Sequence, residues 1–435
     1  MLEAKSLRKA AVPPSLLGNP SPGNIQATRL ALHVNDGGSS CSVYIASGCS
    51  VYKIEVGAVL LSVSFVALLC CFFEEFCYLV EWILQVVSWA ISPVSYSISM
   101  EDSIITTGKE SLLIPVNAEV KHSSIVDRCP HRSEVQSVAL TQGDDNCLIM
   151  GSVDCYGHLI VSWLDALGSD IDRVSYSVLP RDCGIGEGSW AGVCFSPVAV
   201  ARSFCKSIDI YDQDIHIRSL HTLWYPASLT FFSNPYYEGC PSVLAVTEGS
   251  QLSVWDLRTN QNGGCVQRVC GSVGDLMYAL CSSPSGAIAA GGTDRAVTIY
   301  DPRRWSAVSR WVNCSKYEIT GLAFSTINSD YIYVQGVGYE VTCGAWKESK
   351  RTFSFRGDSN WLGFSKLSPA VQQSHHNIAG AGYGMTFLGW IVGFHAIWLE
   401  GFQISVGFLE CSNADVLAGW CDSGSIFVAD AVEQH

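Results

Sequence analysis

The sequence predicts an all-β protein built from a repeated sheet unit. One pattern recurs along the chain: a short apolar strand, a small-residue strand, an Asp or Gly turn, and a β-rich strand that closes on an aromatic residue. The clearest copy covers residues 277–305, and residues 226–260 carry the copy before it. Because one such sheet cannot bury both of its apolar faces alone, the copies are expected to stack on one another.

Five further copies bring the expected number of sheets to seven. Three of them begin at His131, Trp190 and Glu318. A weaker copy begins at Ile25, and the last copy is split between residues 360–366 and 413–430. The split predicts that the seventh sheet is interrupted within its own sequence.

Composition and charge narrow the class of partner. The chain has 435 residues, of which 48% are hydrophobic and 15% charged, which is sufficient for a large buried core. The formal net charge is −14, and there is no extended block of Lys and Arg. A phosphate-binding surface is therefore not expected, so we expect protein partners with basic segments and no nucleic acid.

The cysteines and histidines give no metal signature. Nineteen cysteines are scattered through apolar strands, as expected for reduced core thiols. No C-x-x-C pair occurs, so neither a metal nor a cofactor is expected. Residues 1–23 contain prolines and no secretory signal, which favours the cytoplasm and/or nucleus. These residues are expected to form a flexible tail, and residues 24–435 the repeat domain.

Two short stretches carry a resemblance to a known family. "VWDLR" at residues 254–258 and "IYDPR" at residues 299–303 follow small-residue strands and resemble the WD-repeat β-propellers. The resemblance covers nearly the whole chain apart from the first 23 residues and two apolar segments. It implies four-stranded antiparallel blades in a ring that closes by pairing the N- and C-terminal strands. The expected fold is thus a seven-bladed, all-β propeller of WD-repeat type with two apolar insertions.

The family pattern is incomplete in this sequence. Only the repeat at His131 keeps the histidine that often precedes the first strand in WD-repeats. The expected turn aspartate is present as Asp294, but Gly249 stands at that place in the fourth repeat. An Asp in such a turn accepts hydrogen bonds from backbone N–H groups. Where Gly249 replaces it, another group is needed to accept them.

The two apolar insertions cover about residues 56–97 and 367–410. The first contains an uncharged run of 18 residues at 56–73, close to the roughly 20 residues of a membrane-spanning helix. Three interpretations are open: translated intron sequence, membrane segments, or apolar insertions packed on the propeller. Two crossings would separate the middle repeats from the others, and Lys and Arg are absent from residues 54–108, so the membrane interpretation is disfavoured.

The sequence contains no catalytic constellation, so we expect a protein that is not an enzyme and has no catalytic residues. Residues 244–258 and 288–303 resemble the box of WD-repeat substrate receptors of cullin-4 RING ubiquitin ligases. In that family the box ends in Trp/Tyr-Asp-x-Arg, and its arginine contacts the propeller adaptor of the ligase. The implied adaptor-binding residues are Trp255, Asp256, Arg258, Asp294, Tyr300, Asp301 and Arg303.

Both boxes have a second interpretation. An arginine just past the closing strand can make bidentate contacts with a partner, or it can pair with the aspartate two residues earlier and cover the blade edge. Three functions are therefore open. The expected one is a non-catalytic scaffold that assembles a multiprotein complex. The alternatives are a ligase substrate receptor and a membrane-tethered propeller.

Overall fold

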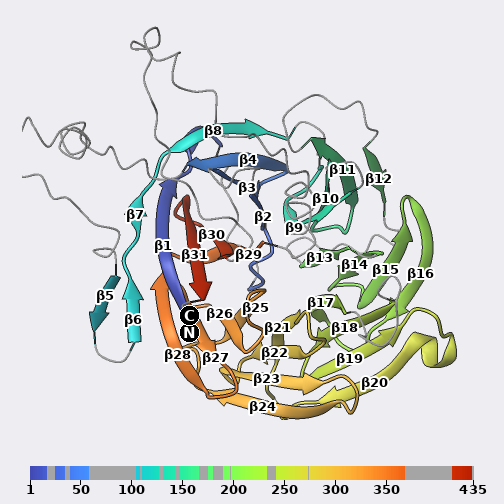
Figure 1. Ribbon diagram of the computed structural model, residues 1–435. Helices are drawn as coiled ribbons and strands as arrows, with labels where there is room; N and C mark the ends of the chain where they lie inside the picture. Colours follow the sequence, from blue (N-terminus) through green and yellow to red (C-terminus); the bar gives the residue numbers. More distant parts are fainter. Residues whose placement is uncertain are drawn as a thin grey trace, which may run out of the picture.

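Seven sheets stand around a common centre in the computed structural model, and each runs outward from an inner strand to the rim (Figure 1). This arrangement confirms the predicted all-β, seven-bladed propeller. The structure describes residues 1–16, 25–34, 40–57, 104–107, 110–126, 131–143, 147–165, 175–179, 190–195, 197–232, 242–272, 274–367 and 414–433.

Blades 1 to 4 follow the chain from its first inner strand. Blade 1 contains β2 (Leu30–Val34), β3 (Ser40–Ser47), β4 (Ser50–Gly57) and β8 (Val120–Ile125). Blade 2 contains β9 (Val135–Gln142), β10 (Cys147–Asp154), β11 (Leu159–Asp165) and β12 (Tyr176–Val178). Blade 3 contains β13 (Ala191–Cys194), β14 (Val198–Arg202), β15 (Ser207–Asp212) and β16 (Ile215–His221). Blade 4 contains β17 (Pro226–Phe232), β18 (Val243–Glu248), β19 (Gln251–Asp256) and β20 (Cys265–Cys270).

Blades 5 to 7 complete the ring. Blade 5 contains β21 (Met277–Ser282), β22 (Ile288–Gly292), β23 (Ala296–Asp301) and β24 (Ser306–Val312). Blade 6 contains β25 (Ile319–Phe324), β26 (Tyr331–Gly336), β27 (Glu340–Ala345) and β28 (Lys350–Arg356). Blade 7 contains β29 (Trp361–Lys366), β30 (Ala414–Cys421), β31 (Ser425–Glu433) and β1 (Leu2–Ala11). Two short 3-10 turns, η1 (Pro14–Leu16) and η4 (Gln261–Gly264), lie between strands.

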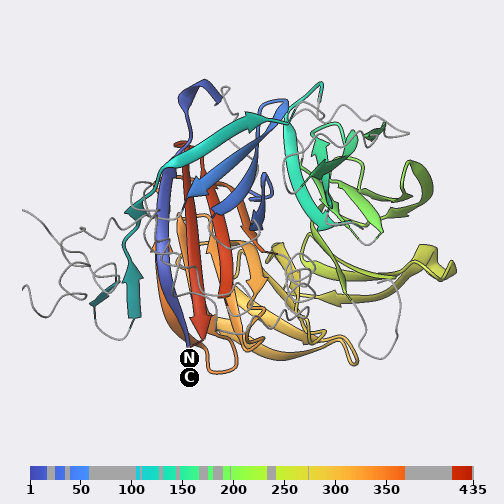
Figure 2. The ribbon, with the colours of Figure 1, turned by 45° about the horizontal axis from the view of Figure 1, so that its top comes forward.

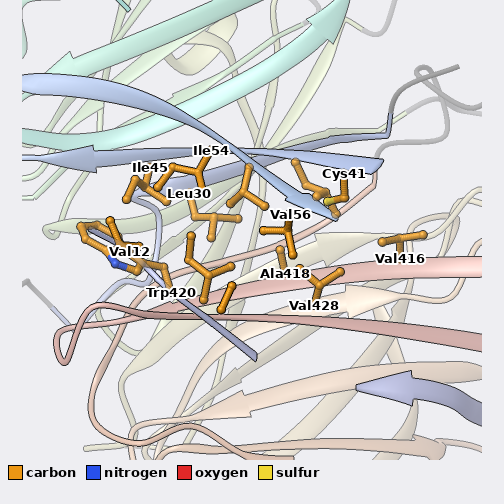
Figure 3. Close-up of a cluster of buried hydrophobic side chains, with 14 of the residues drawn as sticks. Val12, Leu30, Cys41, Ile45, Ile54, Val56, Val416, Ala418, Trp420 and Val428 are labelled. Atoms are coloured by element: carbon orange, nitrogen blue, oxygen red, sulfur yellow. The ribbon is translucent and has the colours of Figure 1, made fainter. Parts of the chain in front are cut away.

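Apolar side chains between neighbouring blades form the core. The cluster between blades 1 and 7 contains Leu30, Ile54, Trp420 and Val428, all buried (Figure 3). Small residues allow close approach elsewhere: all five residues of β22 are buried. Because both faces of these strands are buried, the second strand of each blade is apolar in sequence and lacks the alternation of polar and apolar residues seen in half-exposed strands.

The first strand of the chain closes the ring. Strand β1 pairs antiparallel with β31, so the two ends of the chain lie side by side (Figure 1). Arg8 Nη2 lies 3.1 Å from Asp430 Oδ2, and both side chains are nearly buried. Leu2 and Leu7 are buried in the cluster between blades 6 and 7. Pairing the two ends removes a long exposed strand edge.

Strand β1 corrects the expectation of a flexible tail for residues 1–23. A register shift between Ala4 and Ser6 puts Leu7 out of phase with Leu2, so the strand lacks strict period-two alternation. Its three basic residues, Lys5, Arg8 and Lys9, further obscure the apolar pattern in the sequence. Residues 2–11 are therefore part of the repeat domain.

Both apolar insertions fall at interruptions of a blade, and most of their residues lie outside the described part of the chain. Val56 and Gly57 belong to β4, and the first insertion separates β4 from β8, its neighbour in blade 1. The second separates β29 from β30, as the split seventh repeat predicted. The three interpretations of the insertions concern undescribed residues. Over the described ranges, no helix is both long and apolar enough to span a bilayer.

The segment between the first insertion and β8 runs along the outside of the ring. Strand β6 (Glu110–Leu113) pairs with β28 of blade 6 and with β5 (Ile104–Thr107). Strand β7 (Val116–Asn117) then pairs with β1 of blade 7 before the chain reaches blade 1 (Figure 2). One segment thus contacts three consecutive blades.

Candidate functional site

The first Trp-Asp-x-Arg box lies at the end of β19. Trp255 is buried, its Nε1 donates to Ser253 Oγ at 3.0 Å, and the Arg268 guanidinium lies 5.5 Å from the centre of its ring. The indole therefore anchors the strand inside the blade. It is not presented to a partner.

Asp256 and Arg258 form a local pair at the surface. Arg258 Nη2 donates to Asp256 Oδ2 at 2.8 Å, while the Arg258 backbone N–H and Nε donate to Oδ1 at 2.9 and 3.0 Å. The side-chain hydrogen bonds from Arg258 hold the pKa of Asp256 below its usual value, despite partial burial. The Arg258 side chain is still 56% exposed. Local pairing, the second interpretation of the box, is thus present together with an accessible guanidinium.

The second box repeats this layout at the end of β23. Tyr300 is buried, and burial raises the pKa of its phenol. Asp301 Oδ1 accepts the Arg303 backbone N–H at 2.9 Å, and the Asp301 carbonyl accepts the N–H of Trp305 at 2.7 Å. Arg303 is exposed just past this turn. The turn directs the chain from β23 into the outer strand β24.

Asp294 lies at the other end of blade 5. It occupies the turn between β22 and β23, where its Oδ1 accepts the Ala296 N–H at 3.2 Å. Its Oδ2 accepts a hydrogen bond from Arg310 Nη2 at 2.9 Å. Because β22 and β23 form an antiparallel hairpin, Asp294 and Arg303 lie at opposite ends of the strand. The structure does not bring Asp294 together with the box arginines.

The two boxes meet in a groove between blades 4 and 5. We call it the blade 4–5 groove; its volume is about 410 Å³. It is lined by Phe232, Val243, Val254, Asp256, Val266, Ser285, Gly286, Ala287, Ile299, Tyr300, Asp301, Pro302, Arg303, Trp305, Val308 and Trp346. Asp256 from the first box and Asp301 and Arg303 from the second therefore share one site.

Aromatic side chains make up part of the groove lining. Phe232 and Trp305 pack edge to face with ring centres 5.8 Å apart, and Trp346 of blade 6 adds a third ring. Val308 on β24 is exposed. An apolar concavity with a few charged groups at its border suits an apolar side chain flanked by polar atoms. Histidine and cysteine are absent from the described lining, so it offers recognition groups and no Cys–His nucleophile pair.

Sequence reasoning missed most of the apolar lining. Trp305 lies two residues after Arg303, so an aromatic residue after the box was the available signal. Phe232 belongs to the preceding blade, and nothing local connects it with Trp305. A second hollow of about 380 Å³ includes Asp294, Tyr300 and Arg310 at the other end of blade 5.

A cluster of titratable side chains lies in blade 2. His131 Nε2 lies 2.8 Å from Ser152 Oγ, and its Nδ1 lies 3.4 Å from Asp154 Oδ2. Asp154 Oδ1 also accepts the backbone N–H groups of Tyr156 and His158 at 3.1 and 3.0 Å. Burial raises the pKa of Asp154, but these hydrogen bonds outweigh it and hold the pKa well below its usual range.

Ligand atoms of His131, Asp154 and His158 lie within 4.8 Å of one another, the spacing of a possible metal site. Both ring nitrogens of His131 already lie next to hydrogen-bonding partners in the protein. We assign the cluster to fixing the turn after β10. His131 was the one histidine that the repeat pattern preserved, whereas Asp154 was not recognised as its turn aspartate.

These observations define the class of the protein. The chain is a seven-bladed β-propeller whose two Asp-x-Arg turns border one groove between neighbouring blades. No family model matches the sequence, and no curated protein matches it. The fold is compatible with the WD-repeat resemblance.

Proposed function

We propose that the chain is a non-catalytic scaffold that uses its propeller to assemble a multiprotein complex. The observation that carries this proposal is the blade 4–5 groove, where apolar walls adjoin Asp256, Asp301 and Arg303. Interfaces depend on an apolar centre with charged groups at the border, and this groove offers both. The net charge of −14 favours partners with basic segments.

A charge inside the groove tests the scaffold proposal. Val308→Asp places a carboxylate at an exposed groove position, and Val312→Asp makes the same change on the same strand outside the groove. Proteins that co-purify with the full-length chain from its native source would be compared by quantitative mass spectrometry. We expect Val308→Asp to lose a defined set of partners that Val312→Asp retains. Identical partner sets for both variants and the wild type would reject the groove as a docking site.

We infer a second candidate function, that of a cullin-4 ligase substrate receptor, from the repetition of the box. In two consecutive blades the third strand leads into an Asp-x-Arg turn, and both arginine side chains are exposed. A guanidinium makes planar, bidentate contacts with carboxylate or carbonyl groups of a partner. The local Asp256–Arg258 pair competes with such contacts, so adaptor binding would require Arg258 to exchange or share its partner.

An adaptor pull-down tests this second candidate. The full-length double variant Arg258→Ala with Arg303→Ala would be compared with Arg310→Ala, whose side chain is 50% exposed and also pairs with an aspartate. Receptor function predicts that purified adaptor binds wild type and Arg310→Ala but not the double variant. Equal recovery of all three, or no recovery by the wild type, would remove this candidate. The scaffold proposal would survive that result.

The membrane-tethered propeller remains an alternative that depends on the apolar insertions. Those segments lie mainly outside the described residues, so no contact in the structure supports it. Flotation of the full-length protein with liposomes, compared with a variant lacking residues 58–103 and 368–413, would test it. Equal flotation of the two proteins would exclude tethering through these segments.

A further inference from the structure

A group of large apolar side chains is exposed at the end of blades 3 and 4 opposite the blade 4–5 groove. The register of Pro226 with Glu248, and of Gln251 with Cys270, places the loops around residues 222–225 and 249–250 at one end of blade 4. Asp256 and Val243 pair at the other end, beside the groove. Any site formed by the 222–225 loop is therefore separate from the groove.

The loop between β16 and β17 exposes three consecutive large side chains. Leu223, Trp224 and Tyr225 have exposed fractions of 58%, 55% and 56%. Single exposed apolar residues are ordinary on protein surfaces, but contiguous apolar patches mark sites of interaction. Trp and Tyr are also the residue types that dominate binding energy at protein interfaces.

A buried carboxylate fixes the position of this loop. Glu248 is completely buried, and its Oε2 accepts the backbone N–H groups of Leu223 and Trp224 at 2.6 and 2.9 Å. Its Oε1 accepts a hydrogen bond from Arg268 Nη1 at 2.8 Å. Thr222 Oγ1 donates to the Trp224 carbonyl at 2.7 Å. The exposed side chains therefore project from a backbone that is already ordered, which lowers the entropic cost of binding.

Gly249 explains how Trp224 reaches its place. Gly249 has a φ of +58°, and a Cβ at this position would lie 3.1 Å from Trp224 Cγ. The sequence led us to expect an aspartate here, as in the other turns. The carboxylate is supplied one residue earlier by Glu248, and glycine leaves room for the indole. The departure from the repeat pattern thus coincides with the exposed aromatic loop.

A cation lies beside the loop. Lys206 Nζ lies 4.8 Å from the centre of the Tyr225 ring. The nearby carboxylates of Asp209 and Glu248 are buried and paired with Arg202 and Arg268. The surface therefore offers apolar side chains and a lysine, and the carboxylates of Asp209 and Glu248 are paired with arginines. Such a surface is complementary to an apolar side chain next to a carboxylate.

We propose that Lys206, Leu223, Trp224 and Tyr225, which we call the aromatic patch, bind a partner-protein segment that carries an apolar side chain beside Asp or Glu. The apolar side chain packs against Leu223 and Trp224, and the carboxylate pairs with Lys206 above Tyr225. This site goes beyond the proposed function and does not depend on the blade 4–5 groove.

Two fluorescent peptide pools test the proposal on the full-length protein. One pool carries Leu, Phe or Trp flanked by Asp and Glu, and the other carries the same residues flanked by Lys. We expect wild type to bind the acidic pool more tightly. Trp224→Ala with Tyr225→Ala should weaken that binding by at least about tenfold, as for loss of interface hot spots. Lys206→Glu should remove the preference for the acidic pool.

Two further variants control the test. Ile215→Ala with Ile217→Ala removes exposed apolar side chains from β16 of the same blade and should leave binding unchanged. Gly249→Ala removes no patch side chain but displaces Trp224, so it should weaken binding while the fold, checked by circular dichroism, persists. Preference for the basic pool, no binding of either pool, or full binding by the Trp224 and Tyr225 double variant would overturn the proposal. Self-association or vesicle binding that depends on Trp224 and Tyr225, without peptide binding, would also overturn it.

Discussion

Truncation of Leu7 should destabilise the whole propeller, because the structure places this residue in the core of the closing blade. Leu7 is 2% exposed and belongs to the cluster that contains Phe355, Trp361 and Phe427. Complete burial of a leucine side chain contributes about 1.5–3 kcal/mol. Leu→Ala in a packed core adds a cavity term, so Leu7→Ala should lower the free energy of unfolding by about 2–5 kcal/mol.

Urea unfolding followed by tryptophan fluorescence measures this loss, since the chain contains 13 tryptophans. Leu276→Ala, which truncates an exposed leucine, is the matched control and should change stability by less than about 0.5 kcal/mol. If residues 1–23 formed a flexible tail, Leu7→Ala would behave like this control. Equal unfolding midpoints for Leu7→Ala and wild type would refute the role of β1 in the ring.

Three further perturbations have defined outcomes. The pKa of Asp154 is lower in the folded protein than its ordinary value of about 3.9, so its ionised carboxylate stabilises the fold fully above that pH. This stabilisation is lost as the pH falls from about 3.9 through the folded-state pKa. In thermal melts, Asp154→Asn should therefore lose less stability below about pH 4 than the wild type. Lys366→Met leaves the Asp415 carboxylate buried without its cation, 3.2 Å away in the wild type; chemical denaturation should show a loss of about 3–5 kcal/mol, and a loss below about 1 kcal/mol would contradict the buried pair. Gly292→Ala would place a Cβ in steric overlap with the backbone carbonyl oxygen of Leu276. The melting temperature should fall sharply, and an unchanged melting curve would show that Gly292 does not pack against Leu276.

Most of the ring could be predicted from the sequence because its inner strands carry the repeat signal. The seven repeat copies correspond to the seven blades, including the one that is split between β29 and β30. Two of the strands that were not predicted have an identifiable reason. Strand β8 is separated from its neighbour β4 by the first insertion, and β1 has a register shift that breaks its alternation.

The candidate site was predicted in part. The sequence placed Asp256, Asp301 and Arg303 near the ends of their blades, and the structure brings them to one groove. The sequence motif also groups Asp294 with Asp301 and Arg303, because all three lie within one short stretch of the chain. In the structure the antiparallel β22–β23 hairpin places Asp294, in the turn, at the opposite end of β23 from Asp301 and Arg303. The aromatic lining from Phe232 and Trp305 depends on packing between blades, which no local pattern encodes.

The aromatic patch also depends on contacts between segments that a local sequence pattern does not encode. Gly249 is visible in the sequence as a missing turn aspartate, but its consequence depends on Trp224 from a preceding loop. Glu248 gave no signal, since its role requires the two backbone N–H groups of that loop. The absence of the turn aspartate at Gly249 thus marks the position of the aromatic patch, although the repeat pattern does not predict the patch itself.

Hydrogen–deuterium exchange of the native chain tests ring closure most directly. The structure pairs residues 2–11 with residues 425–433, so both segments should exchange slowly and lose protection together on addition of urea. Exchange of residues 2–11 within seconds, while residues 425–433 stay protected, would show that the first strand does not close the ring.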